Sequence, residues 1–374
     1  MKLNEIDTPA IVLDLDILER NIRRFAEAAA QNGKQLWPMV KTHKSTRLAS
    51  MQREAGATGF LCGTLDEVEA LAAAGFGPLM YAYPPAGEAS IRRCIRAARE
   101  TELLLRLDGL DTAGALDAAA REAGLRLGYT VILDAGLHRF GIPPEEAGPF
   151  ARELRQFEHL EFRGVSTHPG HVYAAGSARE LPRYCEDERR AVKTAVRSLQ
   201  EAGFAPDIVS SGSTPTFFGT VEDELLNVYH PGNYVFMDAI QLSTDTAREA
   251  DCALTVMATV ISHPREDLYI CDAGAKCLGL DQGAHGNASI RGYGVVLGHP
   301  ELTVSGLSEE VGKLHAEGET SLHVGDRIRI IPNHACSSAN LTSFYVGCRG
   351  EDVEGLIPVD IRGNAGGKNV ARVL

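Results

Sequence analysis

Between about residues 35 and 240 the chain alternates short β-rich runs with helical stretches, and this alternation constrains the fold more than any other feature. Strands that alternate with helices are typical of a parallel sheet with crossover helices. The helical stretches, such as 65–75 and 180–203, have apolar residues at helical spacing, and Gly75 and Gly203 are predicted C-caps. The eight predicted strands are QLWPMV, GFLCGT, PLMYAY, ELLLRL, YTVILD, FRGVSTH, DIVSSG and NVYHPG.

Eight such strands fit a closed (β/α)8 barrel of the TIM type, although an open doubly wound sheet has the same local pattern. We favour the α/β barrel because polar residues gather at the C-terminal ends of the strands, where barrel sites lie. After about residue 245 the predicted strands have no helices between them. We therefore expect a barrel over residues 1–242 and a C-terminal, mostly β domain over residues 243–374. No linker separates them, so we expect them to pack together with a site between them.

The charge balance and the cysteines narrow the class of protein. Thirty-seven Lys and Arg against fifty Asp and Glu give a net charge of −13, which disfavours a nucleic-acid partner. The N-terminal segment has no apolar stretch of signal length, and no window approaches the 18 or so apolar residues of a membrane span, so we expect neither export nor membrane insertion. The eight cysteines include no CxxC pair, which predicts reduced thiols and a cytoplasmic location.

Lys41 lies in the segment WPMVKTHKS, directly after the apolar run of the first predicted strand. A strand end would hold its amine rigidly at the catalytic face of a barrel. A second cation such as Lys44 can lower the pKa of a neighbouring amine enough for it to condense with a carbonyl cofactor. The same pattern also fits a solvated surface lysine, and the segment alone leaves both interpretations open.

Two further polar clusters follow predicted strands five and six. In LDAGLHRFGI, Gly136 and Gly141 frame Arg139, whose guanidinium could pair with a phenolate or carboxylate of a ligand or tie the loop to a neighbouring acid. In STHPGHVY, His168, His171 and Tyr173 lie where the fold would place a ligand. We expect both clusters at the same end of the barrel.

Two segments favour a phosphate site, SSGSTPTF at residues 210–217 and HPGNY at residues 230–234. Small residues let backbone N–H groups approach an anion, hydroxyls add donors, and barrels often bind phosphate after strands seven and eight. Each segment alone also fits an ordinary turn. Their position after the last two predicted strands favours the phosphate interpretation.

His334 and Cys336 lie two residues apart in IIPNHACSSAN, within the predicted β domain. On an extended strand they would point the same way, so an imidazole and a thiolate could share one metal ion. Two protein ligands would leave positions open for water or substrate. The alternative is a buried cysteine beside a hydrogen-bonded histidine.

In this order, the motifs DTPAIVLDLDILERNIRR, PMVKTHKS, DAGLHRFG and PGNYVFMD resemble the family of D-serine dehydratase and D-threonine aldolase. Members of this family are relatives of alanine racemase with a pyridoxal-phosphate barrel and a C-terminal β domain, and the resemblance covers nearly the whole chain. It implies that Lys41 binds the cofactor covalently and acts as the base at Cα, with Arg139 near the phenolic oxygen. The other implied cofactor neighbours are His168, Tyr173, Ser211, Gly212, Ser213, Thr214, Gly232, Asn233 and Tyr234.

The resemblance also implies that His334 and Cys336 are metal ligands. The dehydratase branch typically presents His-x-Cys and suits zinc, whereas the aldolase branch presents His-x-Asp and suits manganese or magnesium. A thiolate favours zinc on chemical grounds too. The pair therefore indicates a lyase that dehydrates a β-hydroxy D-amino acid, most similar to D-serine dehydratase, to an oxo acid and ammonia.

Three alternatives remain beside this interpretation. The first is aldol cleavage to glycine and an aldehyde, as in D-threonine aldolase. The second is an amino-acid racemase, which has no use for the metal pair, and the third is a non-catalytic pyridoxal-phosphate carrier, which ordinarily lacks a C-terminal domain. The resemblance further implies a homodimer.

Overall fold

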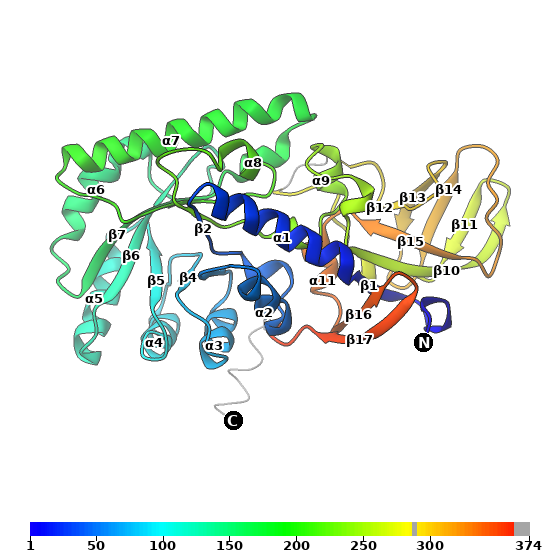
Figure 1. Ribbon diagram of the computed structural model, residues 1–374, viewed down its shortest axis with the longest axis horizontal. Coiled ribbons are helices and arrows are strands. Elements are labelled where there is room, and N and C mark those ends of the chain that lie inside the picture. Colours follow the sequence, from blue (N-terminus) through cyan, green and yellow to red (C-terminus); the bar gives the residue numbers. More distant parts are fainter. Residues whose placement is uncertain (286–289, 363–374) are drawn as a thin grey trace.

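The structure, a computed structural model, describes residues 1–285 and 290–362 and has two parts, a barrel ringed by helices and a separate, mostly β part (Figure 1). The barrel sheet has the order β2-β9-β8-β7-β6-β5-β4-β3, with every pair parallel. Hydrogen bonds from Thr58 N to Leu36 O (3.0 Å) and from Leu61 N to Pro38 O (2.9 Å) join its two ends. The predicted barrel is confirmed. Its strands are β2 (Gln35–Leu36), β3 (Phe60–Cys62), β4 (Leu79–Tyr81), β5 (Leu103–Leu107), β6 (Leu127–Leu133), β7 (Leu160–Thr167), β8 (Ile208–Ser211) and β9 (Val228–Tyr229).

Helices connect successive strands of the barrel and cover its outside. Ser45 and Thr64 cap α2 and α3 by accepting hydrogen bonds from Leu48 N and Glu67 N. Gly75 and Gly203, which follow α3 and α7, have φ of +73° and +81°, which confirms that both helices end at glycines in left-handed conformation. The barrel helices are α2 (Thr46–Glu54), α3 (Leu65–Ala73), α4 (Glu88–Ala97), α5 (Leu110–Ala123), α6 (Ala147–Leu154), α7 (Leu181–Glu201) and α8 (Phe217–Thr220).

The second part is built on strands in the order β13-β14-β11-β10-β1-β16-β17, with β15 pairing both β10 and β12. Its N-terminal member β1 (Ala10–Asp14) pairs antiparallel with β10 and parallel with β16. The segment 1–242, which we expected to form the barrel, thus contributes a strand to the other sheet. The domain boundary at residue 242 stays a proposal. The remaining strands are β10 (Leu254–Arg265), β11 (Leu268–Cys271), β12 (Gly294–Val296), β13 (Leu302–Leu307), β14 (Gly312–Ala316), β15 (Arg327–Pro332), β16 (Phe344–Arg349) and β17 (Asp352–Pro358).

The strand expected to deliver Lys41 is much shorter than predicted. β2 has two residues, and Lys41 lies in the 3₁₀ turn η2 (Val40–Thr42). Pro38 cannot donate a hydrogen bond to a ladder, so regular pairing stops there. The chain still runs beside β3, because Met39 forms a parallel bridge with Leu61. The predicted last strand was too long, since β17 ends at Pro358. The predicted end of that strand, residue 363, lies outside the described residues.

Helix α1 (Leu15–Gln31) runs across the boundary between the two parts (Figure 1). Asp14 caps it by accepting a hydrogen bond from Ile17 N, and its buried Phe25 packs against Phe217 and Tyr234 with ring centroids 4.6 and 4.7 Å apart. The apolar core is therefore continuous between the helix and the barrel segments around it. Among the described residues, helices long and apolar enough to cross a membrane are absent.

Candidate active site

A cavity of about 170 Å³ lies where the C-terminal ends of the barrel strands meet the second part. Residues at or just after the C-terminal ends of the barrel strands line it, as expected for a barrel site. The structure brings eleven of the predicted site residues to this cavity. They are Lys41, Arg139, His168, Tyr173, Gly212, Ser213, Thr214, Gly232, Asn233, His334 and Cys336.

Lys41 lies on the tight turn η2, against the backbone that follows β3. A Cβ atom on Gly63 would come within 3.0 Å of Lys41 Cβ, so glycine is needed for this approach. The neighbouring Lys44 forms a buried ion pair with Glu67, whose other carboxylate oxygen accepts a hydrogen bond from Gly63 N at 2.5 Å. The Lys44 ammonium therefore has a buried counter-charge in the Glu67 carboxylate.

Two guanidinium groups give the cavity a cationic character. Arg139 is exposed and lies over the ring of Phe140, 4.5 Å from its centroid. Arg106, on β5, is only 3% exposed and donates hydrogen bonds to Ser166 Oγ (2.7 Å) and Ala82 O (3.2 Å), while its Nη2 has no partner in the described structure. Burial lowers the pKa of Arg106 to about 10. No Asp or Glu among the described residues lines the cavity, so it suits an anionic ligand.

Two histidines, the half-buried His168 and the buried His230, present acceptor nitrogens at the cavity. His168 Nδ1 lies 2.6 Å from Gly212 O, and His230 Nδ1 lies 2.9 Å from Trp37 O. A carbonyl oxygen can only accept, so Nδ1 carries the proton in both rings and Nε2 has a free lone pair. Burial lowers the pKa of His230 to about 3 and that of His168 well below its ordinary value. Both rings are therefore neutral near pH 7.

Close backbone approaches shape the predicted phosphate side. A Cβ atom on Gly212 would come within 2.5 Å of the His230 backbone, and one on Gly232 within 2.8 Å of Thr42 Oγ1. Thr214 Oγ1 is buried without a hydrogen-bond partner among the described residues. Backbone and hydroxyl donors so close together can bind a phosphate, and they fit the phosphate group of pyridoxal phosphate.

His334 and Cys336 are not on a strand as predicted. β15 ends at Pro332, His334 is the N-cap of the short helix α11 (Ala335–Ala339), and Cys336 lies in its first turn. The two side chains nevertheless line the cavity together, because both belong to this single turn. The same-face argument from an extended strand was therefore wrong, although the proximity is real.

The ionisation of His334 and that of Cys336 are coupled to each other. Burial opposes ionisation of both groups, but the Cys336 thiolate and the Asp281 carboxylate raise the pKa of His334 well above its ordinary value. Conversely, the His334 charge lowers the pKa of Cys336 despite its burial. Asp281 Oδ1 lies 3.5 Å from His334 Nδ1, an arrangement that orients metal-binding imidazoles in many sites. Clusters of three or more metal-binding side chains are absent from the described residues.

Sequence comparisons agree with this geometry. The family described as alanine racemase, N-terminal domain, matches residues 13–239, and the one described as putative serine dehydratase domain matches residues 253–348. The chain belongs to the D-serine dehydratase and D-threonine aldolase family. Members of this family are pyridoxal-phosphate-dependent lyases, which confirms the predicted class of enzyme.

Individual relatives span the reactions of the family. D-threo-3-hydroxyaspartate dehydratase from Delftia sp. (strain HT23) is 33% identical over 89% of this chain and 92% of its own length. The solved D-threonine aldolase from Filomicrobium marinum is 27% identical, covers 97% of this chain and 98% of its own, and superposes with a TM-score of 0.89. A D-threo-3-hydroxyaspartate dehydratase mutant solved in the metal-free form is 31% identical, covers 96% and 99%, and has a TM-score of 0.88.

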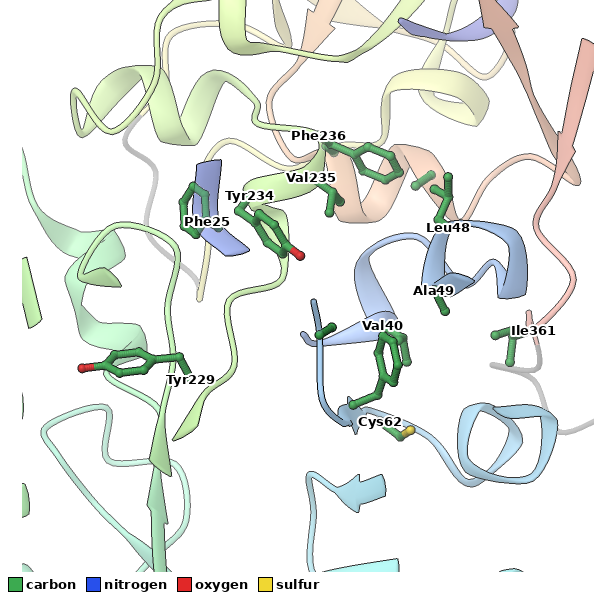
Figure 2. Close-up of a cluster of buried hydrophobic side chains, with 14 of the residues drawn as sticks. Phe25, Val40, Leu48, Ala49, Cys62, Tyr229, Tyr234, Val235, Phe236 and Ile361 are labelled. Carbon is green, nitrogen blue, oxygen red and sulfur yellow. The ribbon is translucent and has the colours of Figure 1, made fainter. Parts of the chain in front are cut away.

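Two predicted cofactor neighbours do not reach the cavity of this family member. Ser211 is fully buried in β8 and lies beside the Glu188 carboxyl of α7, because successive strand residues point to opposite faces. Tyr234 is fully buried against Phe25 in the apolar core (Figure 2), and its hydroxyl accepts a hydrogen bond from Gln52 Nε2 at 2.9 Å. Both assignments are corrected.

Polar residues outside the predicted set also line the cavity, among them Arg106, His230, Gln241 and His285. Arg106 is the one charged residue in the apolar run ELLLRL, which was a usable signal. His230 opens the phosphate segment HPGNY but was not selected. Gln241 and His285 follow no strand end and gave no local signal. Their place at the cavity depends on the packing of the second part against the barrel.

Proposed function

We propose that this chain is a pyridoxal-phosphate- and metal-dependent lyase that removes water from a β-hydroxy D-amino acid, as D-serine dehydratase does. The observation that carries the proposal is that His334 and Cys336, two residues apart in the α11 turn, line the same cavity as Lys41. A thiolate ligand favours zinc over magnesium or manganese. The expected products are an oxo acid and ammonia.

The barrel residues have distinct roles in this proposal. Lys41 would bind the cofactor covalently and, once freed by substrate, its amine would take the proton from Cα. Arg139 would pair with the phenolic oxygen, while Ser213, Thr214 and the backbone around Gly232 would bind the phosphate. Pyridoxal phosphate, when bound, supplies an electron sink for the negative charge that develops at Cα.

His334 and Cys336 would hold a divalent ion, for which zinc is our proposal. Such an ion would supply Lewis acidity to the departing β-hydroxyl, which is otherwise a poor leaving group. Asp281 would fix the His334 ring so that its other nitrogen faces the ion. The metal-free mutant structure of a related dehydratase supports metal binding at this fold.

Aldol cleavage to glycine and an aldehyde is the second candidate, because the Filomicrobium marinum aldolase superposes over nearly the whole chain. Incubation with D-serine, D-threonine and D-3-hydroxyaspartate separates the two reactions. If the products are ammonia and an oxo acid, the dehydration proposal is supported. If they are glycine and an aldehyde, the enzyme catalyses aldol cleavage and the dehydration proposal is wrong. L-serine and L-threonine are the matched controls and should react far more slowly. Equal rates for both enantiomers would contradict the proposed stereochemistry.

We further propose a cytoplasmic homodimer. The family resemblance supports the dimer, and the reduced cysteines in the described structure are consistent with a reducing compartment. Light scattering coupled to size exclusion at micromolar concentration tests the dimer. A monomer mass over the whole concentration range would contradict it.

A further inference from the structure

The Asp238 carboxylate is fully buried between the two parts of the protein and accepts hydrogen bonds from three separate donors. Oδ2 accepts from Asn233 Nδ2 (2.5 Å) and from Ala335 N (2.8 Å), and Oδ1 accepts from Gln241 N (3.1 Å). Asn233 and Gln241 line the cavity on the barrel side, whereas Ala335 belongs to the second part. One carboxylate therefore touches both sides of the site.

Two of these donors, Asn233 and Ala335, belong to segments with a proposed ligand. Asn233 follows Gly232 on the phosphate side, and its Nδ2 also lies 3.9 Å from Cys336 Sγ. Ala335 lies between His334 and Cys336, so its N–H fixes the turn that presents both candidate metal ligands. Cys336 Sγ in turn lies 3.4 Å from Thr42 Oγ1, next to Lys41.

The backbone leading to Asp238 is strained in a way that supports a positional role. Met237 is buried and has φ of +52°, a left-handed conformation that is costly for a residue other than glycine. Asp238 itself caps the short helix α9 (Ala239–Ser243) through the Gln241 contact. The left-handed backbone at Met237 is thus adjacent to the residue whose carboxylate contacts Asn233 and Ala335.

We propose that Asp238 is a positioning residue that couples the cofactor side of the site to the metal side. By holding Asn233 and Ala335 with a single oxygen, it fixes the phosphate turn relative to the metal-ligand turn. Binding at either side should then favour binding at the other, and the coupling must be the same in both directions. The inference rests on the proposed function, because it assumes that cofactor and metal bind where we place them.

The first measurement uses the wild-type protein and does not depend on any variant folding. The dissociation constant of pyridoxal phosphate is measured by absorbance with and without saturating Zn²⁺. We expect Zn²⁺ to tighten cofactor binding by about fivefold or more, the lower end of typical coupling. Equal affinities in the presence and absence of Zn²⁺ would overturn the coupling. Failure of the wild type to bind cofactor or metal at all would instead overturn the proposed function.

The second measurement uses Asp238→Asn, which keeps the shape but leaves one acceptor oxygen for three donors. We expect both affinities to fall by about tenfold or more, and the coupling to vanish, because a lost hydrogen bond to a charged group costs about 1.5–3 kcal/mol. Co²⁺ replaces Zn²⁺ as the spectroscopic probe, since its charge-transfer band reports the bond to the Cys336 sulfur. A weaker charge-transfer band in the folded variant indicates that the Cys336 sulfur has moved away from the metal ion. A general loss of stability would not weaken the band while the protein remains folded.

Two matched controls restrict the effect to one side. Asp281→Asn changes the carboxylate beside His334 and should weaken the metal alone, whereas Ser213→Ala should weaken the cofactor alone. Thermal unfolding of each variant identifies the temperature range in which all are folded. If Asp238→Asn changes only one affinity, or leaves the wild-type coupling intact, Asp238 is a local structural residue and the inference is wrong.

Discussion

The two sides of the cavity are built in different ways. On the barrel side, polar groups come from separate strands and each has its own anchor, as Arg106 does through Ser166 and His230 through Trp37 O. On the other side, both candidate metal ligands lie within one turn that depends on Asp281 and on the Ala335 N–H. Substitutions on the barrel side should therefore remove single contacts, whereas a change in the α11 turn should remove the whole metal site.

Lys41→Ala gives the largest expected effect and tests the barrel side. It removes the proposed covalent link and the base, so turnover should fall by about 10⁴-fold, at the upper end for a lost general base. Borohydride reduction of the wild type followed by peptide mapping should place the pyridoxyl label on Lys41. A label on Lys44 would contradict the assignment and the ion pair that occupies its amine.

Cys336→Ala tests the metal side and should lower turnover by about 10³-fold, because the departing hydroxyl loses several kcal/mol of stabilisation. Elemental analysis should show less than one metal ion per chain, while the cofactor absorbance and the fold remain. A chelator should have the same effect on the wild type, and Cys336→Asp should shift preference towards harder ions. Full activity on β-hydroxy D-amino acids after metal removal would show that His334 and Cys336 only pack together.

Glu67→Gln sharpens the comparison by disturbing the barrel side without touching its ligands. The variant leaves the Lys44 ammonium buried and uncompensated, so the free energy of unfolding should fall by about 3 kcal/mol. Urea unfolding measures the change. The double variant with Lys44→Met removes both charges and should recover most of the lost stability. If it recovers none, the Gly63 contact rather than the ion pair stabilises this turn.

His43 gives the smallest effect, a pH dependence of stability. Its Nδ1 accepts a hydrogen bond from Ser45 N (3.1 Å), so the buried ring is neutral, and burial lowers its pKa to about 4. Below about pH 6.5 the unfolded chain binds a proton on His43 that the folded chain excludes. The contribution of the neutral ring to the free energy of unfolding is therefore complete above pH 6.5 and is lost as the pH falls towards 4. We expect a loss of about 2 kcal/mol between pH 6.5 and 4.5.

The control for that titration is His43→Asn, which lacks the ionisable ring. Its unfolding free energy should depend less steeply on pH over the same interval, and the difference between the two slopes isolates His43 from other titrating groups. Identical slopes for the two proteins would mean that His43 is protonated in the folded state. The barrel side would then be less tightly sealed than its hydrogen bonds indicate.

Local sequence patterns determined the barrel and most of its site. Alternating strands and helices depend on short-range periodicity, and strand ends necessarily meet at one face of a closed barrel, so Lys41, Arg139 and His168 could be placed together from the sequence. The glycines at the helix ends were readable for the same reason, because their left-handed conformation is local.

Only the tertiary structure decided which partner each polar group has. Pairing of Ala10 with Met257 joins an N-terminal strand to a sheet far along the chain, and no local pattern encodes that contact. The partner of Lys44 likewise lies 23 residues away at Glu67. The orientation of Tyr234 towards the core and the helical turn at Cys336 depend on packing between the two parts. Side-chain direction follows from long-range burial and hydrogen bonding, which sequence spacing alone does not contain.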